Sequence, residues 1–258
     1  RLLIYYILDK LHSSELEEKG SIICIYDSNI ALYDNYTQLL YNNYSKKTKL
    51  DLHIQDKQIN YTHKYDFSSL NSSMNSSVDQ HKVEFVFYNS INMSEMFRNI
   101  ASLISIELTI KKGVRITDIS HAFENCTNLQ NFTINIFDTD NVIDMSYMFS
   151  GCTNLENLDI SKLKTDNAKN MSNMFENCIN LKSIHLPNSN TEKVESMKNM
   201  FNNCKSLTSL DLSNFHTRIS KDMSFMFSGC TSLASLNMPN FNTENVLNMS
   251  NMFNNCNR

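Results

Sequence analysis

Hydrophobic side chains recur along the C-terminal two thirds of the chain with a fixed period of 26 residues. The string Met-Ser-x-Met-Phe, or a close relative of it, begins at Met93, Ile119, Met145, Met171, Met197, Met223 and Met249. Equal intervals without insertion or deletion identify an internal repeat rather than a chance similarity. We therefore predict a solenoid over residues 83–258, in which seven repeats, the last one truncated, stack on one another.

The first half of each repeat has the apolar spacing of a helix. Met145, Met148, Phe149 and Cys152 lie at i, i+3, i+4 and i+7, which places them on one helix face. The residue before each such run belongs to the types that cap helix N-termini. These residues are Asn92, Asp118, Asp144, Asn170, Ser196, Asp222 and Asn248. Gly residues occur where such a short helix is expected to end, at Gly151 and Gly229.

The second half of each repeat has the spacing of a strand and a return loop. Leu158 and Ile160 alternate with polar residues, as in a half-buried strand. The loop carries a further apolar residue at Phe137, Leu163, Phe215 and Phe241, and Ser189 is the exception. It also carries a threonine at Thr139, Thr165, Thr191, Thr217 and Thr243. The predicted fold is an α/β repeat solenoid of the leucine-rich-repeat type, a right-handed coil with a parallel sheet on one face and short helices on the other.

These motifs resemble a known family. The stretch MSYMFSGCTNLENLDISKLKTDNAKN, residues 145–170, is similar to the repeats of BspA-like leucine-rich repeat surface proteins. The resemblance covers about residues 91–258. It implies a secreted or cell-surface protein that adheres to host proteins, matrix or other cells. The first copy departs from the pattern, because Ile100 replaces the cysteine, as expected for a terminal repeat.

The cysteines and methionines are expected to pack in the core. Cys126, Cys152, Cys178, Cys204, Cys230 and Cys256 recur once per repeat, and no CxxC metal motif occurs. Helix-side rows are expected 8–10 Å apart, too far for disulfides, so we predict buried free thiols. No nucleotide-binding or catalytic motif is present, and the seven histidines share no spacing. We therefore expect no cofactor, no metal and no enzymatic activity.

The outward strand positions form the predicted binding surface. We expect them to line an extended concave sheet face, small, polar and mildly acidic, like the contact surfaces of other solenoids. The central column is Glu107, Thr133, Asp159, His185, Asp211 and Asn237, and the flanking column includes Asn131, Asn157, Ser183 and Ser209. An alternative remains open, in which this face is merely solvated and a partner binds elsewhere.

The first ninety residues have no 26-residue period. We predict a region of unknown role over residues 1–67 and a low-complexity linker over 68–82. Within the first region, strands are predicted at Ile22–Tyr26 and Leu50–Ile54, and a helix over 2–16. Residues 83–88 are predicted to form the edge strand that starts the solenoid. The run of residues 2–8 is read as a buried element or as the remnant of a signal peptide, and the chain, which begins with Arg1, as a fragment or processed product.

The net charge of the chain argues against some classes of binding partner. The net charge is −4, divided evenly between the two regions, so neither nucleic acid nor an anionic membrane is an expected partner, and no segment is long enough to insert into a bilayer. We predict a non-enzymatic module that binds a protein or glycan, including host or matrix ligands, at the cell surface or outside the cell. Two alternatives stay open: an intracellular leucine-rich-repeat scaffold, and an enzyme whose active site lies in the N-terminal region.

Overall fold

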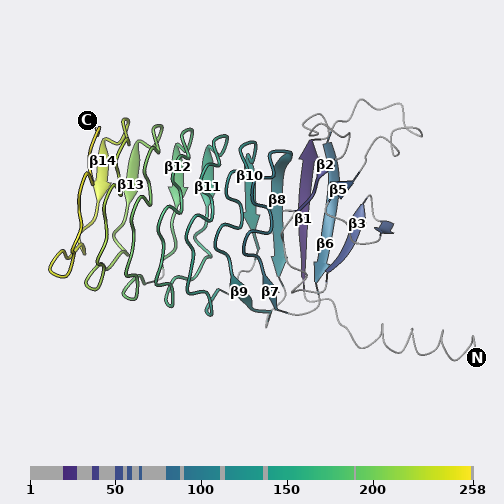
Figure 1. Ribbon diagram of the computed structural model, residues 1–258, viewed down its shortest axis with the longest axis horizontal. Coiled ribbons are helices and arrows are strands. Elements are labelled where there is room, and N and C mark those ends of the chain that lie inside the picture. Colours follow the sequence, from purple (N-terminus) through teal and green to yellow (C-terminus); the bar gives the residue numbers. More distant parts are fainter. Residues whose placement is uncertain are drawn as a thin grey trace, which may run out of the picture.

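The computed structural model shows a stack of coils closed at one end by an antiparallel sheet (Figure 1). The structure describes residues 20–27, 37–40, 50–54, 57–59, 64–65, 80–87, 90–110, 114–135, 139–188 and 190–256. The helix predicted over 2–16, most of the predicted linker and the loop residues Phe137 and Ser189 lie outside these ranges.

One side of the stack carries a short strand in each coil. These strands are β8 (Leu103–Ile110), β10 (Asn131–Ile134), β11 (Asn157–Asp159), β12 (Ser183–His185), β13 (Ser209–Asp211) and β14 (Ser235–Asn237). Where they pair they are parallel and in register at 26 residues, so that Asn131 faces Ser105, Asn157 faces Ser183 and Ser209 faces Ser235. The repeat solenoid and its period are thus confirmed.

The opposite side, which we call the turn side, contains no helix within the described residues, so the predicted short helices are wrong. The backbone there forms successive turns, with Ser150 N bonded to Tyr147 O and Cys152 N to Phe149 O. Alternate amides instead donate to the next coil, as Tyr147 N does to Ser172 O at 3.0 Å and Phe149 N to Met174 O at 2.9 Å. A helix would need those amides for its own i−4 carbonyls, so bonding between coils replaces it.

The predicted capping residues do bind backbone amides, but they begin turns. The carboxylate of Asp144 accepts a bond from Ser146 N at 2.8 Å, and Asn170 and Asp222 accept equivalent bonds from the residue two positions later. Asn and Asp favour this local bond in turns as well as at helix ends. The same short side chains therefore satisfy the amide in either structure.

Two residues of each turn segment have positive φ, four positions apart. The first slot is occupied by Glu95, His121, Tyr147, Asn173, Asn199, Phe225 and Asn251. The second is always Asn or Gly: Asn99, Asn125, Gly151, Asn177, Asn203, Gly229 and Asn255. These are the residue types that adopt a left-handed conformation most readily. Gly151 and Gly229 therefore serve a turn, and their interpretation as helix ends is wrong.

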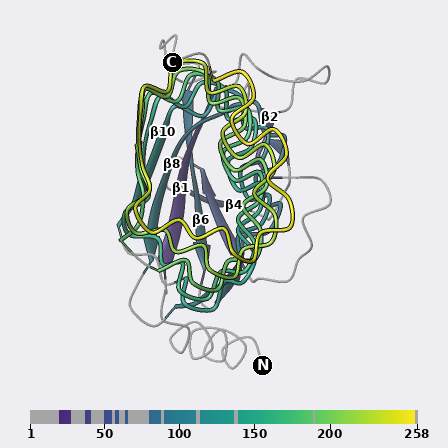
Figure 2. The ribbon, with the colours of Figure 1, turned by 90° about the vertical axis from the view of Figure 1, so that its left-hand side faces the viewer.

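The repeated phenylalanines form a continuous stack inside the turn side. The rings of Phe97, Phe123, Phe149, Phe175, Phe201, Phe227 and Phe253 lie one above another with centroids 5.3–6.0 Å apart. This interval is well below the 8–10 Å that separates packed helices. Both sides of a coil therefore advance by a similar distance, and the stack is straight (Figures 1 and 2). The expected concave sheet face is accordingly wrong, because a straight stack presents a flat one.

Cysteine and threonine rows join the coils internally. Cys152 Sγ donates to Phe123 O at 3.2 Å, and the other five repeat thiols donate to the equivalent carbonyl. All described cysteines are free, and only Cys256 is not fully buried, so the prediction of buried free thiols is confirmed for the rest. Thr165 Oγ1 donates to Asn190 O at 3.0 Å and Thr217 Oγ1 to Asn242 O at 2.8 Å, which explains the recurring loop threonine.

An antiparallel sheet covers the N-terminal end of the stack. Strand β1 (Gly20–Asp27) pairs with β8 on one side and with β6 (Gln80–Phe87) on the other, followed by β3 (Leu50–Ile54) and β4 (Lys57–Ile59). The strands predicted at Ile22–Tyr26 and Leu50–Ile54 are confirmed. The strand predicted at residues 83–88 is confirmed as part of β6, but its predicted edge position is wrong, because β6 lies between β1 and β3. A sheet in this place protects the otherwise unpaired edge of β8.

Four further strands are short. Strand β2 (Thr37–Gln38) pairs antiparallel with β5 (Lys64–Tyr65), and β7 (Ile91–Asn92) pairs parallel with β9 (Ile116–Asp118). The β7–β9 pair leads into the first two turn segments. It begins the ladder of bridges that continues at Asp144, Asn170, Ser196, Asp222 and Asn248. The residues predicted as helix caps thus also link the coils through their backbone.

Candidate binding surface

The outward side of strands β8 and β10–β14, which we call the strand face, carries the predicted binding columns. All ten residues expected there are exposed: Glu107, Thr133, Asp159, His185, Asp211, Asn237, Asn131, Asn157, Ser183 and Ser209. The strand registers place Asp159 beside His185 and Asp211 beside Asn237. The columns therefore run along one continuous side of the stack, with β10 and β8 visible on that side in the end-on view (Figure 2).

Part of this polar surface is occupied by bonds between coils. Ser183 Oγ donates to Asn157 Oδ1 at 2.6 Å, and Asn237 Nδ2 donates to Asp211 Oδ1 at 2.9 Å. Side-chain ladders of this kind fix the orientation of neighbouring residues. The strand face is consequently an ordered array of polar groups.

Asp159 and Asp211 are held by their own backbone. Asp159 Oδ1 accepts a bond from Ser161 N at 2.9 Å, and Asp211 Oδ1 accepts one from Ser213 N at 2.9 Å. Hydrogen bonds from the Ser161 side chain and backbone lower the pKa of Asp159, and nearby His185 contributes less. The equivalent bonds from Ser213 lower the pKa of Asp211. Both residues are therefore carboxylates at neutral pH.

The sheet on the strand face is interrupted twice. In the part of the chain that the structure describes, no ladder of hydrogen bonds joins β10 to β11 or β12 to β13. A hollow opens beside each interruption. The first, of about 370 Å³, is lined only by polar residues: Gln130, Asn131, Asn154, Glu156, Asn157 and Asn180. The second, of about 490 Å³, has a mixed lining that includes Asp159, His185 and Asp211 on one part and Ile184, Leu186 and Phe215 on another.

The second hollow exposes core residues that the two flanking coils bury. Ile184 and Leu186 are partly exposed, whereas their equivalents Leu210 and Leu212 are 4% and 0% exposed. In the flanking coils the loop places Leu163 and Phe215 in the core, each 1% exposed. This coil has Ser189 at the same place in the sequence. The repeat therefore supplies one large apolar side chain fewer where the hollow lies.

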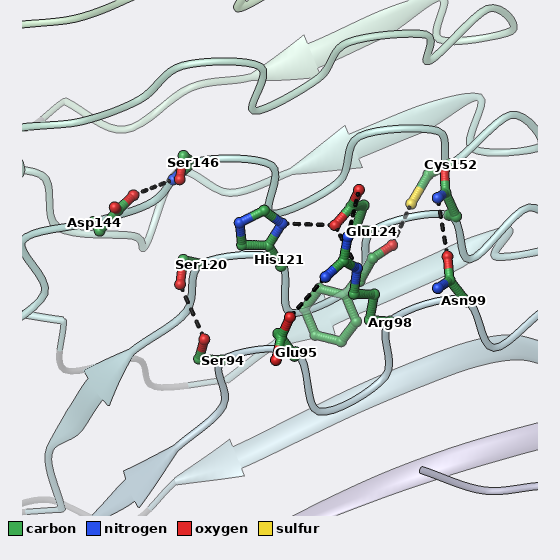
Figure 3. A network of polar contacts seen from close by, with 12 residues as sticks. Ser94, Glu95, Arg98, Asn99, Ser120, His121, Glu124, Asp144, Ser146 and Cys152 are labelled. Carbon is green, nitrogen blue, oxygen red and sulfur yellow. Dashed lines mark hydrogen bonds and ion pairs between the residues drawn. The ribbon is translucent and has the colours of Figure 1, made fainter. Parts of the chain in front are cut away.

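A second polar cluster, which the sequence did not predict, lies on the turn side (Figure 3). Arg98 contacts Glu95 at 2.6 Å and Glu124 at 2.8 Å, and Glu124 also meets His121 Nδ1 at 2.6 Å. The His121 ring stacks on Tyr147 with centroids 4.7 Å apart. Arg98 and Glu124 are 26 residues apart in the sequence, and this offset of one repeat could have predicted that they lie side by side in adjacent coils. Because the arginine neutralises two carboxylates, this cluster joins the first coils electrostatically.

The described part of the chain offers neither a metal site nor a membrane-spanning helix. No group of three or more His, Cys, Asp or Glu residues within the described ranges is arranged to hold a metal ion. No helix among those residues has the length and hydropathy needed to cross a membrane.

Fold and face together define the class of protein: a repeat solenoid with one straight, ordered polar face. The chain belongs to the family described as "Mycoplasma protein of unknown function, DUF285", which matches residues 91–189 and 179–258. Comparison with curated proteins gives no match.

One solved structure is similar to part of the chain. It is that of a leucine-rich cell surface protein from Faecalibacterium prausnitzii, with 18% sequence identity and a TM-score of 0.37. The match covers 63% of this chain and 44% of the other, so this chain spans less than half the length of that protein.

Proposed function

We propose that this protein is a non-enzymatic binding module that holds a macromolecular partner on its strand face. The observation that carries the proposal is the exposure of ten polar residues in columns along one straight side of the stack. Solenoids commonly bind partners along such extended surfaces. Ladder bonds such as that from Ser183 to Asn157 order the face before binding, which lowers the entropic cost of association.

The partner is a protein or a glycan, and the site of action is the cell surface or the extracellular space. This location rests on the resemblance of residues 145–170 to BspA-like repeats, whose relatives adhere to host and matrix molecules. The hollows of about 370 and 490 Å³ support the proposal, because each gives the face a concave feature in which a side chain or sugar could be buried.

An array of extracellular matrix proteins and glycans, probed with the full 258-residue chain, tests this proposal. Ser209→Arg together with Ser235→Arg would place two long side chains on the strand face, since both serines are exposed and neighbours in register. The matched control is Ser250→Arg with Asn254→Arg, at exposed positions of the turn side.

We expect at least one array ligand to bind, and the strand-face pair to weaken that binding by about tenfold or more through steric exclusion. The turn-side pair should leave it unchanged. Loss of binding in the turn-side variant alone would assign the partner to the other side. An array without any ligand would contradict the proposed ligand classes.

A further inference from the structure

The hollow between β12 and β13 combines an apolar wall with two carboxylates. Ile184 and Leu186 expose apolar surface to it, and Asp159 and Asp211 lie on either side of His185 along the central column. Its volume of about 490 Å³ lies within the usual range for ligand sites, roughly 300–1,000 Å³. Covering the exposed apolar surface would remove it from water, which favours binding.

The two carboxylates differ in their partners from three other acids on the surface of the stack. Glu156, Glu195 and Asp140 each form an ion pair with a lysine of the next coil. Among the described residues no ion pair joins Asp159 or Asp211 to a basic side chain, and the nearby Lys162 donates to Ile134 O at 3.1 Å. The bonds from Ser161 N and Ser213 N hold both carboxylates at the rim.

The apolar wall and the charged rim are complementary to one kind of side chain. A long basic side chain has an aliphatic stem that packs on apolar surface and a cationic head that stays near solvent. A guanidinium head also forms paired hydrogen bonds with carboxylates and stacks on flat rings such as that of His185. A neutral sugar would gain nothing from the charges of Asp159 and Asp211.

We propose that this hollow binds an arginine side chain of a protein partner, with its stem against Ile184 and Leu186 and its guanidinium at Asp159 and Asp211. The inference rests on the proposed function, since it names the partner chemistry for part of the strand face. An arginine site implies that the partner is a protein rather than a glycan. Asp159 on β11 and Asp211 on β13 both line the hollow, so a guanidinium bound there has a carboxylate on either side of it.

The test uses N-acetyl-arginine amide as the probe and N-acetyl-citrulline amide as its neutral isostere. Each is titrated into the 15N-labelled full chain, and backbone amide shifts are followed by NMR. The variant Asp159→Asn with Asp211→Asn removes both charges but keeps the Oδ1 acceptors used by Ser161 N and Ser213 N. The matched control, Glu192→Gln with Glu244→Gln, removes the same charge from exposed positions elsewhere.

We expect the arginine probe to shift the amides of residues 184–188 and 211–215, and to bind at least about tenfold more tightly than the citrulline probe. The Asp pair should weaken arginine binding by a similar factor, and the Glu pair should not. Equal binding of both probes, or arginine binding that survives loss of both carboxylates, would overturn the proposal. The spectrum of each variant shows directly whether it is folded.

The NMR titration and the ligand array can fail independently of each other. Arginine binding without any array ligand would keep the inference and contradict the tested partner classes. A glycan that binds the strand face equally well after loss of both carboxylates would keep the proposed function and overturn the inference.

Discussion

At the scale of single residues, the second positive-φ slot determines which amino acid each coil can accept. Every coil has Asn or Gly there, from Asn99 to Asn255. In the two glycine coils the backbone also approaches the preceding coil closely. A Cβ added to Gly151, whose φ is +74°, would lie 2.3 Å from Asn125 Oδ1, and one added to Gly229 would lie 2.4 Å from Asn203 Oδ1. These asparagines occupy the space that a side chain would need.

Gly151→Ala should therefore destabilise the fold by about 1–3 kcal/mol, because alanine is strained at positive φ and Asn125 must leave its bond to Asn99. Urea unfolding should show a lower midpoint at an unchanged slope. Asn255→Gly, in the same slot of the terminal coil, should change stability by less than about 0.5 kcal/mol. Similar midpoints for the two variants would contradict the role assigned to the slot.

The buried thiols make a second prediction at this scale. Desolvation raises the pKa of Cys178 and of Cys230 to about 12, whereas Cys256 is partly exposed. At pH 8 only about one in 10⁴ of the Cys178 and Cys230 thiols is ionised. The thiolate is the form that reacts, so these two residues should react slowly. Maleimide should label Cys256 first in the native protein and the six others only after unfolding. Rapid native labelling of several cysteines would contradict the stacked core.

Glu176 makes a prediction about pH. Desolvation raises its pKa above 4.5, with repulsion from Glu124 as a smaller cause, while the bond from Asn202 acts in the opposite direction. The folded state thus holds this proton more tightly than the unfolded state. The stability it contributes is present below the unfolded pKa and is lost as pH rises through the folded pKa.

Glu176→Gln keeps an acceptor for Asn202 and removes the charge. The variant should be more stable than the parent at pH 7, and the difference in melting temperature should shrink at pH 4. Glu192→Gln, at an exposed position, provides the comparison. An advantage of the same size at both pH values would show that desolvation of the charge is not its cause.

At the scale of elements, the sequence predicted the period, the rows and the burial, but not the local structure of the turn side. The spacing i, i+3, i+4, i+7 fits one helix face and equally fits two consecutive turns that point the same side chains inward. Asp144 and its equivalents do not distinguish a helix from consecutive turns, because their side chains accept a bond from an amide two residues later in either structure. The informative signal was the invariable Asn or Gly at the second slot, which no helix interior requires.

The position of the hollow between β12 and β13 was even harder to predict from the sequence. The sequence placed Asp159, His185 and Asp211 in one exposed column, and the structure agrees. The missing ladder between β12 and β13 depends on backbone positions that no side-chain pattern specifies. Only Ser189, where flanking coils have Leu163 and Phe215, distinguished this coil beforehand.

The phenylalanine stack should be the main energetic link between turn segments. Phe175 is fully buried and stacks on Phe149 and Phe201 at 6.0 and 5.3 Å. Phe175→Ala should cost about 3–5 kcal/mol in the free energy of unfolding. Phe253→Ala should cost less than half as much, because that ring is 47% exposed and has a stacking partner on one side, Phe227. Equal losses in urea unfolding would contradict the stack.

At the scale of the whole molecule, bonding on both sides of each coil makes the stack straight. Amides such as Phe149 N bind the next coil on the turn side, just as the strands pair on the other. A helix-backed solenoid has wider spacing on its helical side and must curve. Straightness gives a flat strand face, and the two hollows supply concave features on it. This geometry underlies the proposed mode of binding.

Distances between spin labels test this geometry most directly. One pair, on cysteines replacing Ser94 and Ser250, spans six coil intervals on the turn side. The other, replacing Ser105 and Ser235, spans five on the strand face. A Cys256→Ser background removes the one partly exposed native thiol. At the 5.3–6.0 Å per coil of the phenylalanine stack, the labelled backbones of the turn-side pair should lie roughly 32–36 Å apart. At about 4.8 Å per strand, those of the strand-face pair should lie roughly 24 Å apart, and the label linkers broaden both distances. A turn-side distance of about 48–60 Å, as packed helices would give, would contradict it.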